Sequence, residues 1–482
     1  MKDQVYDRRT LLRLCGTAGA LLSTALLAAC GAGATSGAGS SGAVTTSAAA
    51  GAATATTTAK ATVASSTAAA AASSSAPGSK VQLSLWTTWG DKDAVAEQAL
   101  ADAFAKTQSN IAVTVTTVTD GNKFTAAMAS GAPPDLLQTW NAAQVATWAT
   151  SGGVVQLDSL IASGKLDLST LDRSGLAAGQ LFGKQYGMPM LVYTNTLLFW
   201  NKSIFQDVGL DPNTAPVTWQ DLTTAALKIT KKQGDTLTRI GFVPNNGQGG
   251  VPAIMWSFGG QLYSDDGKQV TPDNPGVVKC AEYTRQQIVQ LGGPALIAAF
   301  TKGFGKNEND PFYIGQTGMQ INGEWVPTFV SKYKPDLDYG IGFMPYDEST
   351  PGAKNSGNIA TNLIIMPKET KHQQDAWNVI AFANTPEPNL ALAKALGNTP
   401  QVLAAADMLE QAAATPQLKF IFQAHKSRNM KTTPINPIST DYNKEFGAAI
   451  GKIMSGTADA PSALAQVKSV IQPKLDAIVK GA

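Results

Sequence analysis

The side chains best suited to chemistry in this 482-residue chain are aromatic and polar, not metal ligands. The sequence has nine Trp and ten Tyr, but only two His and three Cys. An indole offers a large flat apolar surface at low entropic cost, and Asp, Glu and Arg make strong hydrogen bonds. This combination suits a ligand with apolar C–H faces and hydroxyl edges, such as a sugar. The scarcity of His and Cys disfavours transition-metal capture and a disulfide scaffold.

Motifs of several enzyme classes are missing from the sequence. It contains no H-E-x-x-H, no G-x-x-x-x-G-K-[ST] and no G-x-S-x-G, which are typical of zinc peptidases, P-loop proteins and serine hydrolases. A formal net charge of +2 provides no basic surface for nucleic acid. We therefore expect a protein that is not an enzyme, without catalytic residues, cofactor, metal or nucleic-acid partner.

The first thirty residues have the pattern of an export signal. Three arginines precede an apolar run from Leu14 to Ala29, which is shorter than the roughly 20 residues that a bilayer span needs. Arg8-Arg9 resembles a twin-arginine signal, with general secretory export as the alternative. Leu27-Ala-Ala-Cys30 resembles a bacterial lipobox, although Cys30 could be incidental to an ordinary signal. We predict that 1–29 is a signal peptide and that Cys30 is lipidated.

Residues 30–79 are predicted to be the lipidated Cys and a disordered linker. All positions from 31 to 79 are Gly, Ala, Ser or Thr except Val44, Lys60, Val63 and Pro77. This composition cannot bury enough apolar surface to offset the entropy of ordering. A coil of this length has an end-to-end distance of about 40 Å. Without residues 1–29 the chain holds 33 basic and 33 acidic residues.

The rest of the chain alternates strand and helix patterns, which must position the aromatic side chains. Apolar and polar residues alternate over 81–85 and 111–115, and helical spacing covers 93–106, where Val95, Ala99 and Leu100 mark the apolar face. A βαβ order predicts a parallel sheet covered by helices. Thr218 and Asp221 form a capping-box pattern. Further helices are expected over 219–232, 376–383, 390–396, 446–454 and 462–478.

Several patches of 80–482 together resemble the extracellular solute-binding proteins of ABC importers, of the maltose- and oligosaccharide-binding type (family 1). The resemblance is carried by Leu83–Asp91, Gly131–Trp140, Gly183–Lys202, Val217–Leu222, Phe312–Trp325 and Tyr339–Pro345. It implies an α/β, two-lobed periplasmic-binding-protein-like fold with interleaved lobes and a hinge of crossing segments. Lobe one would comprise about 80–191 and 342–392, and lobe two about 192–341 and 393–482. The long linker departs from the family pattern.

The same resemblance, together with the chemistry of the residues, gives the candidate ligand-binding residues. Trp89 and Asp91 follow the first strand, and Trp140 and Asn141 follow the third, although Asn141 could instead cap a helix. Trp256 could belong to the core rather than the cleft. The full set is Trp89, Asp91, Trp140, Asn141, Tyr193, Asn195, Trp256, Glu324, Trp325 and Asn358.

The resemblance implies a monomeric receptor anchored to the outer face of the cell membrane by Cys30. It would capture a small solute, expected to be a carbohydrate, between its lobes and deliver it to ABC permease subunits. Two alternatives remain open: a receptor of the same type for another organic solute, and a secreted glycoside hydrolase. The second would need paired carboxylates, which Asp91 and Glu324 could supply from opposite lobes.

Overall fold

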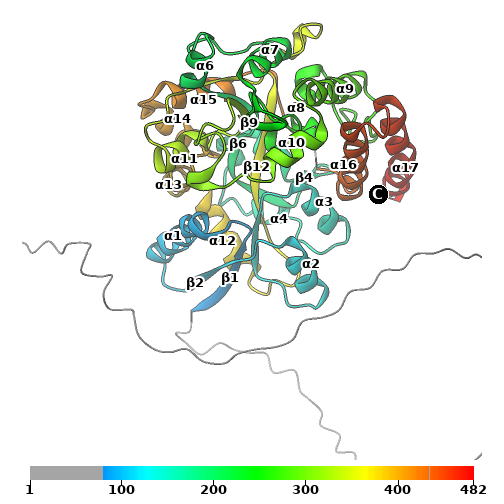
Figure 1. Ribbon diagram of the computed structural model, residues 1–482. Coiled ribbons are helices and arrows are strands. Elements are labelled where there is room, and N and C mark those ends of the chain that lie inside the picture. The colour runs from blue at the N-terminus through cyan, green and yellow to red at the C-terminus, as the bar shows by residue number, and fades with distance from the viewer. Residues whose placement is uncertain (1–79, 434, 482) are drawn as a thin grey trace, which may run out of the picture. The chain divides into compact units, whose positions relative to one another are not determined.

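A computed structural model describes residues 80–433 and 435–481 of the chain (Figure 1). The predicted signal peptide, Cys30 and the Gly/Ala/Ser/Thr linker lie outside the described residues. In Figure 1, β1, β2, α1 and α12 gather at the lower end of the described region and α6 and α7 at its upper end. The long strand β12 lies between these two ends.

A mixed sheet forms the centre of the first lobe. The predicted alternation at 81–85 produces β1, in which Leu83 and Leu85 are buried, and β1 pairs in parallel with β2 and β3. β12 then inserts antiparallel between β3 and β6, so the expected parallel sheet becomes mixed. The strand order is β13-β6-β12-β3-β1-β2, and β14 pairs with β12. The strands are β1 (Val81–Thr87), β2 (Ile111–Thr117), β3 (Leu136–Thr139), β6 (Gly187–Thr194), β12 (Gly357–Ile365), β13 (Thr399–Pro400) and β14 (Met430–Lys431).

Helices cover this sheet, and one of them buries an acid. The predicted helix at 93–106 is α1, and Leu100 of its expected apolar face is buried, together with Phe104. Val95 is instead 65% exposed, and the acid Glu97 takes a buried position on the inward face. The first-lobe helices are α1 (Asp91–Thr107), α2 (Gly121–Ala129), α3 (Ala142–Thr150), α4 (Asp158–Ile161), α5 (Arg173–Ala178), α12 (Gln373–Ala383), α13 (Pro386–Leu396) and α14 (Leu403–Gln411); β4 (Gln180–Leu181) and β5 (Lys184–Gln185) form a small hairpin.

The second lobe packs helices around a three-stranded antiparallel sheet of order β10-β7-β11. Trp200 and Trp219 are buried in its core. The strands and 3-10 turns are β7 (Leu197–Asn201), β8 (Lys231–Gln233), β9 (Thr236–Arg239), β10 (Met319–Asn322), β11 (Tyr339–Phe343), η2 (Gly247–Gly249) and η3 (Met255–Phe258). The helices are α6 (Lys202–Asp207), α7 (Trp219–Ile229), α8 (Val251–Ile254), α9 (Pro275–Gln290), α10 (Pro294–Thr301), α11 (Val326–Tyr333), α15 (Pro416–His425), α16 (Ser439–Ser455) and α17 (Ala460–Gly481).

The capping box that opens α7 is present. The Thr218 hydroxyl accepts a hydrogen bond from the Asp221 backbone N–H (3.1 Å), and the Asp221 carboxylate accepts one from the Thr218 N–H (2.9 Å). The helix ends at Ile229 rather than near Lys232. Thr230 is extended and its hydroxyl donates to the Ala226 carbonyl, so the next residues leave as strand β8.

The two lobes are interleaved along the chain, as predicted, but the C-terminal boundary is different. The expected assignment places all of 393–482 in the second lobe. Leu396, Val402 and Ala405 instead share a buried cluster with Leu83 of the first sheet. The physical reason is β13, which pairs with β6 and holds α13 and α14 against the first lobe. The second-lobe core resumes with α15 to α17.

Candidate functional site

A cavity of about 550 Å³ is lined by residues of both lobes, a volume within the usual range of small-molecule sites. Five aromatic side chains and several amides contribute to it. The lining residues are Trp89, Asp93, Trp140, Tyr193, Asn195, Gln248, Trp325, Phe329, Ala360, Asn362, Leu396 and Asn398.

Two tryptophans reach the cavity because they follow neighbouring parallel strands. Trp89 lies two residues after the end of β1 and Trp140 directly follows β3, and these strands pair with each other. The carboxyl ends of parallel strands meet at one edge of a sheet, where α/β proteins commonly bind ligands. The backbone N–H of Trp89 donates a hydrogen bond to the hydroxyl of Thr87 (3.2 Å), which fixes the chain where it leaves the strand. Trp140 is 59% exposed and thus presents an open indole face.

A second aromatic pair forms where the chain crosses between the lobes. Tyr193 on β6 and Trp325 at the start of α11 lie edge to face, with ring centroids 5.7 Å apart. Gly323 permits this placement, because a Cβ atom there would lie 2.3 Å from the Trp325 ring. Burial, and then the charge of Glu324, raise the pKa of Tyr193 to about 12. The phenol is therefore neutral near pH 7 and can both donate and accept hydrogen bonds.

Polar side chains of β1, β3 and β12 are hydrogen-bonded to amides that line the cavity. The Thr87 hydroxyl donates to the Gln138 carbonyl oxygen (2.9 Å), and the Gln138 amide donates to Asn362 (3.4 Å). Asn362 lines the cavity. Nearby, the Asn358 Nδ2 donates to Asn195 Oδ1 (3.2 Å). These contacts hold the amides in defined orientations.

Glu324 lies beside the cavity but does not line it. Its carboxylate is 1% exposed and accepts hydrogen bonds from the Thr194 N–H (2.9 Å), the Thr399 N–H (2.5 Å) and His425 Nε2 (2.5 Å). These donors belong to β6, β13 and α15. Burial alone would lower the pKa of His425, but the charge and hydrogen bond of Glu324, with the charge of Asp172, raise it. Glu324 therefore joins the crossing segments just before Trp325.

The candidate residues fall into three groups. Five of them surround the one cavity: Trp89, Trp140, Tyr193, Asn195 and Trp325. Four others have contacts elsewhere: Asn141 caps α3 through the Gln144 N–H, Trp256 packs on the second-lobe core, Glu324 joins the crossings and Asn358 holds Asn195. The side chain of Asp91, which begins α1, lies outside the described residues.

Sequence reasoning missed several cavity residues. Gln248 comes from the glycine-rich stretch 246–250, whose composition indicates only a turn. Asn362 lies inside β12, and Phe329 lies in α11 four residues after Trp325, at helical spacing. That spacing is the one signal that could have identified Phe329.

No helix within 80–433 or 435–481 is long and apolar enough to cross a membrane. In the same part of the chain, no group of three or more His, Cys, Asp or Glu side chains is arranged to hold a metal ion.

The profile of the bacterial extracellular solute-binding proteins matches residues 86–389, more than half of the chain. The chain belongs to this family. Its members are binding proteins rather than enzymes, and the two-lobed α/β fold predicted from the sequence is confirmed.

The sequence identity to individual relatives is low. The structure of CpMnBP1 with mannotriose bound is 28% identical and superimposes with a TM-score of 0.74 over 81% of this chain and 99% of that one. The acarbose-binding GacH receptor of Streptomyces glaucescens is 20% identical, with a TM-score of 0.68 over 82% and 99%, which supports the fold. The chain spans about half the length of curated relatives such as the arabinooligosaccharide-binding protein of Bacillus subtilis, at 26% identity over 220 residues, 45% of this chain and 49% of the relative.

Proposed function

We propose that this protein is an extracytoplasmic receptor that captures a sugar or oligosaccharide between its lobes and delivers it to an ABC import permease. The observation that carries the proposal is the single cavity where Trp89, Trp140, Tyr193 and Trp325 meet amide side chains. Aromatic faces suit the C–H faces of a pyranose ring, and amides suit its hydroxyl edge. A relative with bound mannotriose and another named for arabinooligosaccharides support this ligand class.

Ligand capture is proposed to couple to closure of the lobes. Trp89 and Trp140 come from the first lobe, and Gln248 and Phe329 from the second. A ligand that touches both sets gains its full contacts only when the lobes are closed, so binding shifts the population toward the closed form. The permease would then recognise that closed form.

Saccharide titrations test the ligand class. We expect saturable binding of at least one of mannose, mannotriose, maltotriose or an arabinooligosaccharide by isothermal titration calorimetry, with a change in Trp fluorescence. Trp325→Ala should weaken it at least about tenfold, or about 1.4 kcal/mol. Trp256→Phe is the matched control, since that indole packs on the second-lobe core. Absence of saccharide binding, together with a thermal shift by an amino acid, peptide or polyamine, would replace the carbohydrate by another solute.

The membrane anchor is proposed from the sequence alone. Cys30 would be acylated after removal of 1–29, and the linker 31–79 would tether the receptor to the outer face of the membrane. We expect Cys30→Ala to release the protein from the membrane fraction into the medium, with saccharide affinity unchanged. Retention of the variant in the membrane, or equal release of the wild type, would contradict lipidation at Cys30.

A further inference from the structure

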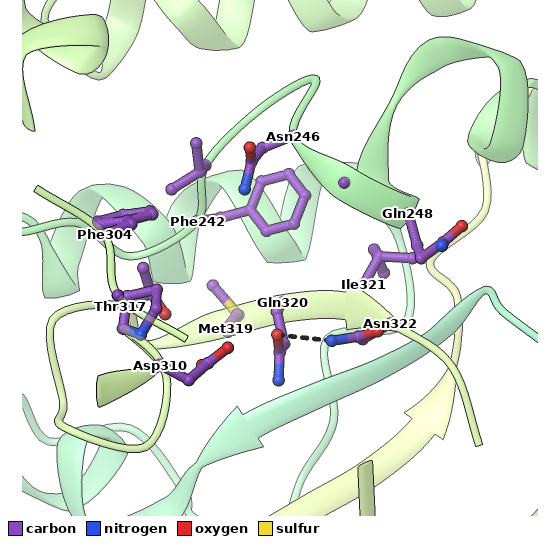
Figure 2. Close-up of a pocket in the computed structure, with 14 residues that line it drawn as sticks. Phe242, Asn246, Gln248, Phe304, Asp310, Thr317, Met319, Gln320, Ile321 and Asn322 are labelled. Carbon is purple, nitrogen blue, oxygen red and sulfur yellow. Dashed lines mark hydrogen bonds between the residues drawn. The ribbon is translucent and has the colours of Figure 1, made fainter. Parts of the chain in front are cut away.

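A second cavity, of about 300 Å³, lies inside the second lobe (Figure 2). It lies between the 242–248 loop, the 304–311 loop and β10. All of its lining residues come from the second lobe: Phe242, Val243, Asn246, Gly247, Gln248, Phe304, Gly305, Asp310, Pro311, Thr317, Met319, Gln320, Ile321 and Asn322. Gln248 also lines the interlobe cavity, so the two cavities are neighbours.

The lining combines aromatic surface with an unmet hydrogen-bond donor. Phe242 and Phe304 contribute their rings (Figure 2). Gln320 Oε1 accepts a hydrogen bond from Asn322 Nδ2 (3.0 Å), which directs the other end of the amide, and the buried Gln320 Nε2 has no partner among the described residues. A buried donor without an acceptor costs about 1–3 kcal/mol. This nitrogen is covered rather than open to the cavity, so a ligand oxygen relieves the cost only if the amide turns toward it.

A carboxyl group adds an acceptor to the same lining. Asp310 accepts a hydrogen bond from the Phe312 N–H (2.9 Å), which orients its side chain in the loop. Figure 2 shows the Asp310 carboxyl on the side of the cavity where Met319 and Gln320 lie. Sugar hydroxyls donate charge-assisted hydrogen bonds to carboxylates.

Both bordering loops have constrained backbones. Asn245 (φ 54°) and Asn307 (φ 57°) adopt the left-handed conformation, which is costly for most residues and tolerated best by Asn and Asp after Gly. The Asn245 side chain accepts a hydrogen bond from the Val251 N–H (3.2 Å) and so attaches its loop to α8. Gly305 lies so close to Asn309 that a Cβ there would be 2.5 Å from the Asn309 Cβ. The cavity therefore has fixed walls.

We propose that this second-lobe cavity is a subsite for one further sugar residue of an oligosaccharide whose other residues occupy the interlobe cavity. The inference rests on the proposed function and specifies its ligand as at least a disaccharide. The volume is at the lower limit of ligand sites, which fits a single ring. Gln248, which lines both cavities, lies where the two sugar residues are joined. Since the walls come from one lobe, the subsite is complete whether the lobes are open or closed.

Calorimetric titration of two saccharide series tests the subsite: mannose, mannobiose and mannotriose, and glucose, maltose and maltotriose. We expect the wild type to bind the trisaccharide of one series at least tenfold more tightly than its monosaccharide. Phe304→Ala should remove at least most of that preference, with monosaccharide affinity unchanged. Phe300→Leu is the matched control. The Phe300 ring packs edge to face on Phe304, with ring centroids 5.3 Å apart, but does not line the cavity.

Asp310→Asn gives a second, milder test in case Phe304→Ala does not fold. It should weaken the trisaccharide several-fold and leave the monosaccharide unchanged. Equal affinity of the wild type for mono- and trisaccharides would overturn the subsite while leaving the carbohydrate receptor intact. So would variants that weaken both ligands equally or neither. The wild type could also fail to bind any saccharide, whether from these two series, an arabinooligosaccharide or another sugar. In that case the proposed function itself fails, and the subsite fails with it.

Discussion

Two buried glutamates near the ligand cavity have opposite surroundings. Glu97 on α1 is 0% exposed and Glu324 before α11 is 1% exposed. Glu324 accepts hydrogen bonds from three donors, whereas neither carboxylate oxygen of Glu97 has a hydrogen-bond partner among the described residues. The Thr87 hydroxyl is near enough to Glu97 to lower its pKa slightly, but it donates its hydrogen bond to Gln138 instead.

The difference shows that burial alone does not determine what an acidic side chain contributes. A buried charge costs free energy unless partners replace the water it loses. Glu324 has those partners, and they come from β6, β13 and α15, which its carboxylate holds together. Burial raises the pKa of Glu97 to about 8, so near neutral pH this carboxyl is largely protonated. The same substitution at both positions should therefore have opposite effects.

The largest effect is expected at Glu324. Glu324→Met leaves two buried backbone N–H groups and His425 without their acceptor, and should lower the free energy of unfolding by about 3–5 kcal/mol. Ligand affinity should also fall, because Trp325 is the next residue. Chemical denaturation at pH 7 measures the first effect and calorimetry the second. A loss below 1 kcal/mol would mean that the carboxylate does not hold the crossing segments together.

Glu97→Met should instead be neutral or stabilising at pH 8, by up to about 2 kcal/mol, because it removes a desolvated carboxyl with no partner to lose. Met has a similar length and adapts to irregular cores. Chemical denaturation of the two Met variants side by side makes the comparison direct. Destabilisation of Glu97→Met as strong as that of Glu324→Met would eliminate the distinction between the two sites.

The pH dependence of stability sharpens the same comparison. The pKa of Glu97 is raised from 4.5 to about 8 on folding, so the folded state binds more protons in this range and the free energy of unfolding falls as pH rises. At about 1.4 kcal/mol per pKa unit, the loss between pH 5.5 and 8 is up to about 3 kcal/mol. Glu97→Gln should remove this slope, and Glu387→Gln, at an exposed position of α13, should retain it. An unchanged slope in Glu97→Gln would contradict the burial effect.

The sequence predicted the aromatic edge of the ligand cavity much better than the surroundings of either glutamate. Trp89 and Trp140 could be placed at a common edge because each follows a strand whose short-range pattern is clear. The burial of Glu97 could not be predicted. It lies at helical spacing from Leu100 and Phe104 on the buried face of α1, and an acid on that face breaks the apolar pattern. The donors to Glu324 lie 75 to 130 residues away, so no local pattern indicates them.

The smallest expected effect concerns the partner of Glu324. The pKa of His425 is raised in the folded protein because Glu324 and Asp172 outweigh the effect of burial. The stabilisation from its charge is therefore fully present below the unfolded pKa and is lost as pH rises through the folded pKa. We expect His425→Gln to cost more stability at pH 5.5 than at pH 9, relative to wild type at each pH. Because the variant and the wild type are compared at the same pH, the titration of Glu97 affects both proteins equally and does not contribute to the difference.

His372→Gln is the control, because that side chain is 50% exposed and 3.8 Å from Asp375. An equal cost of His425→Gln at the two pH values would mean that only the neutral hydrogen bond to Glu324 contributes.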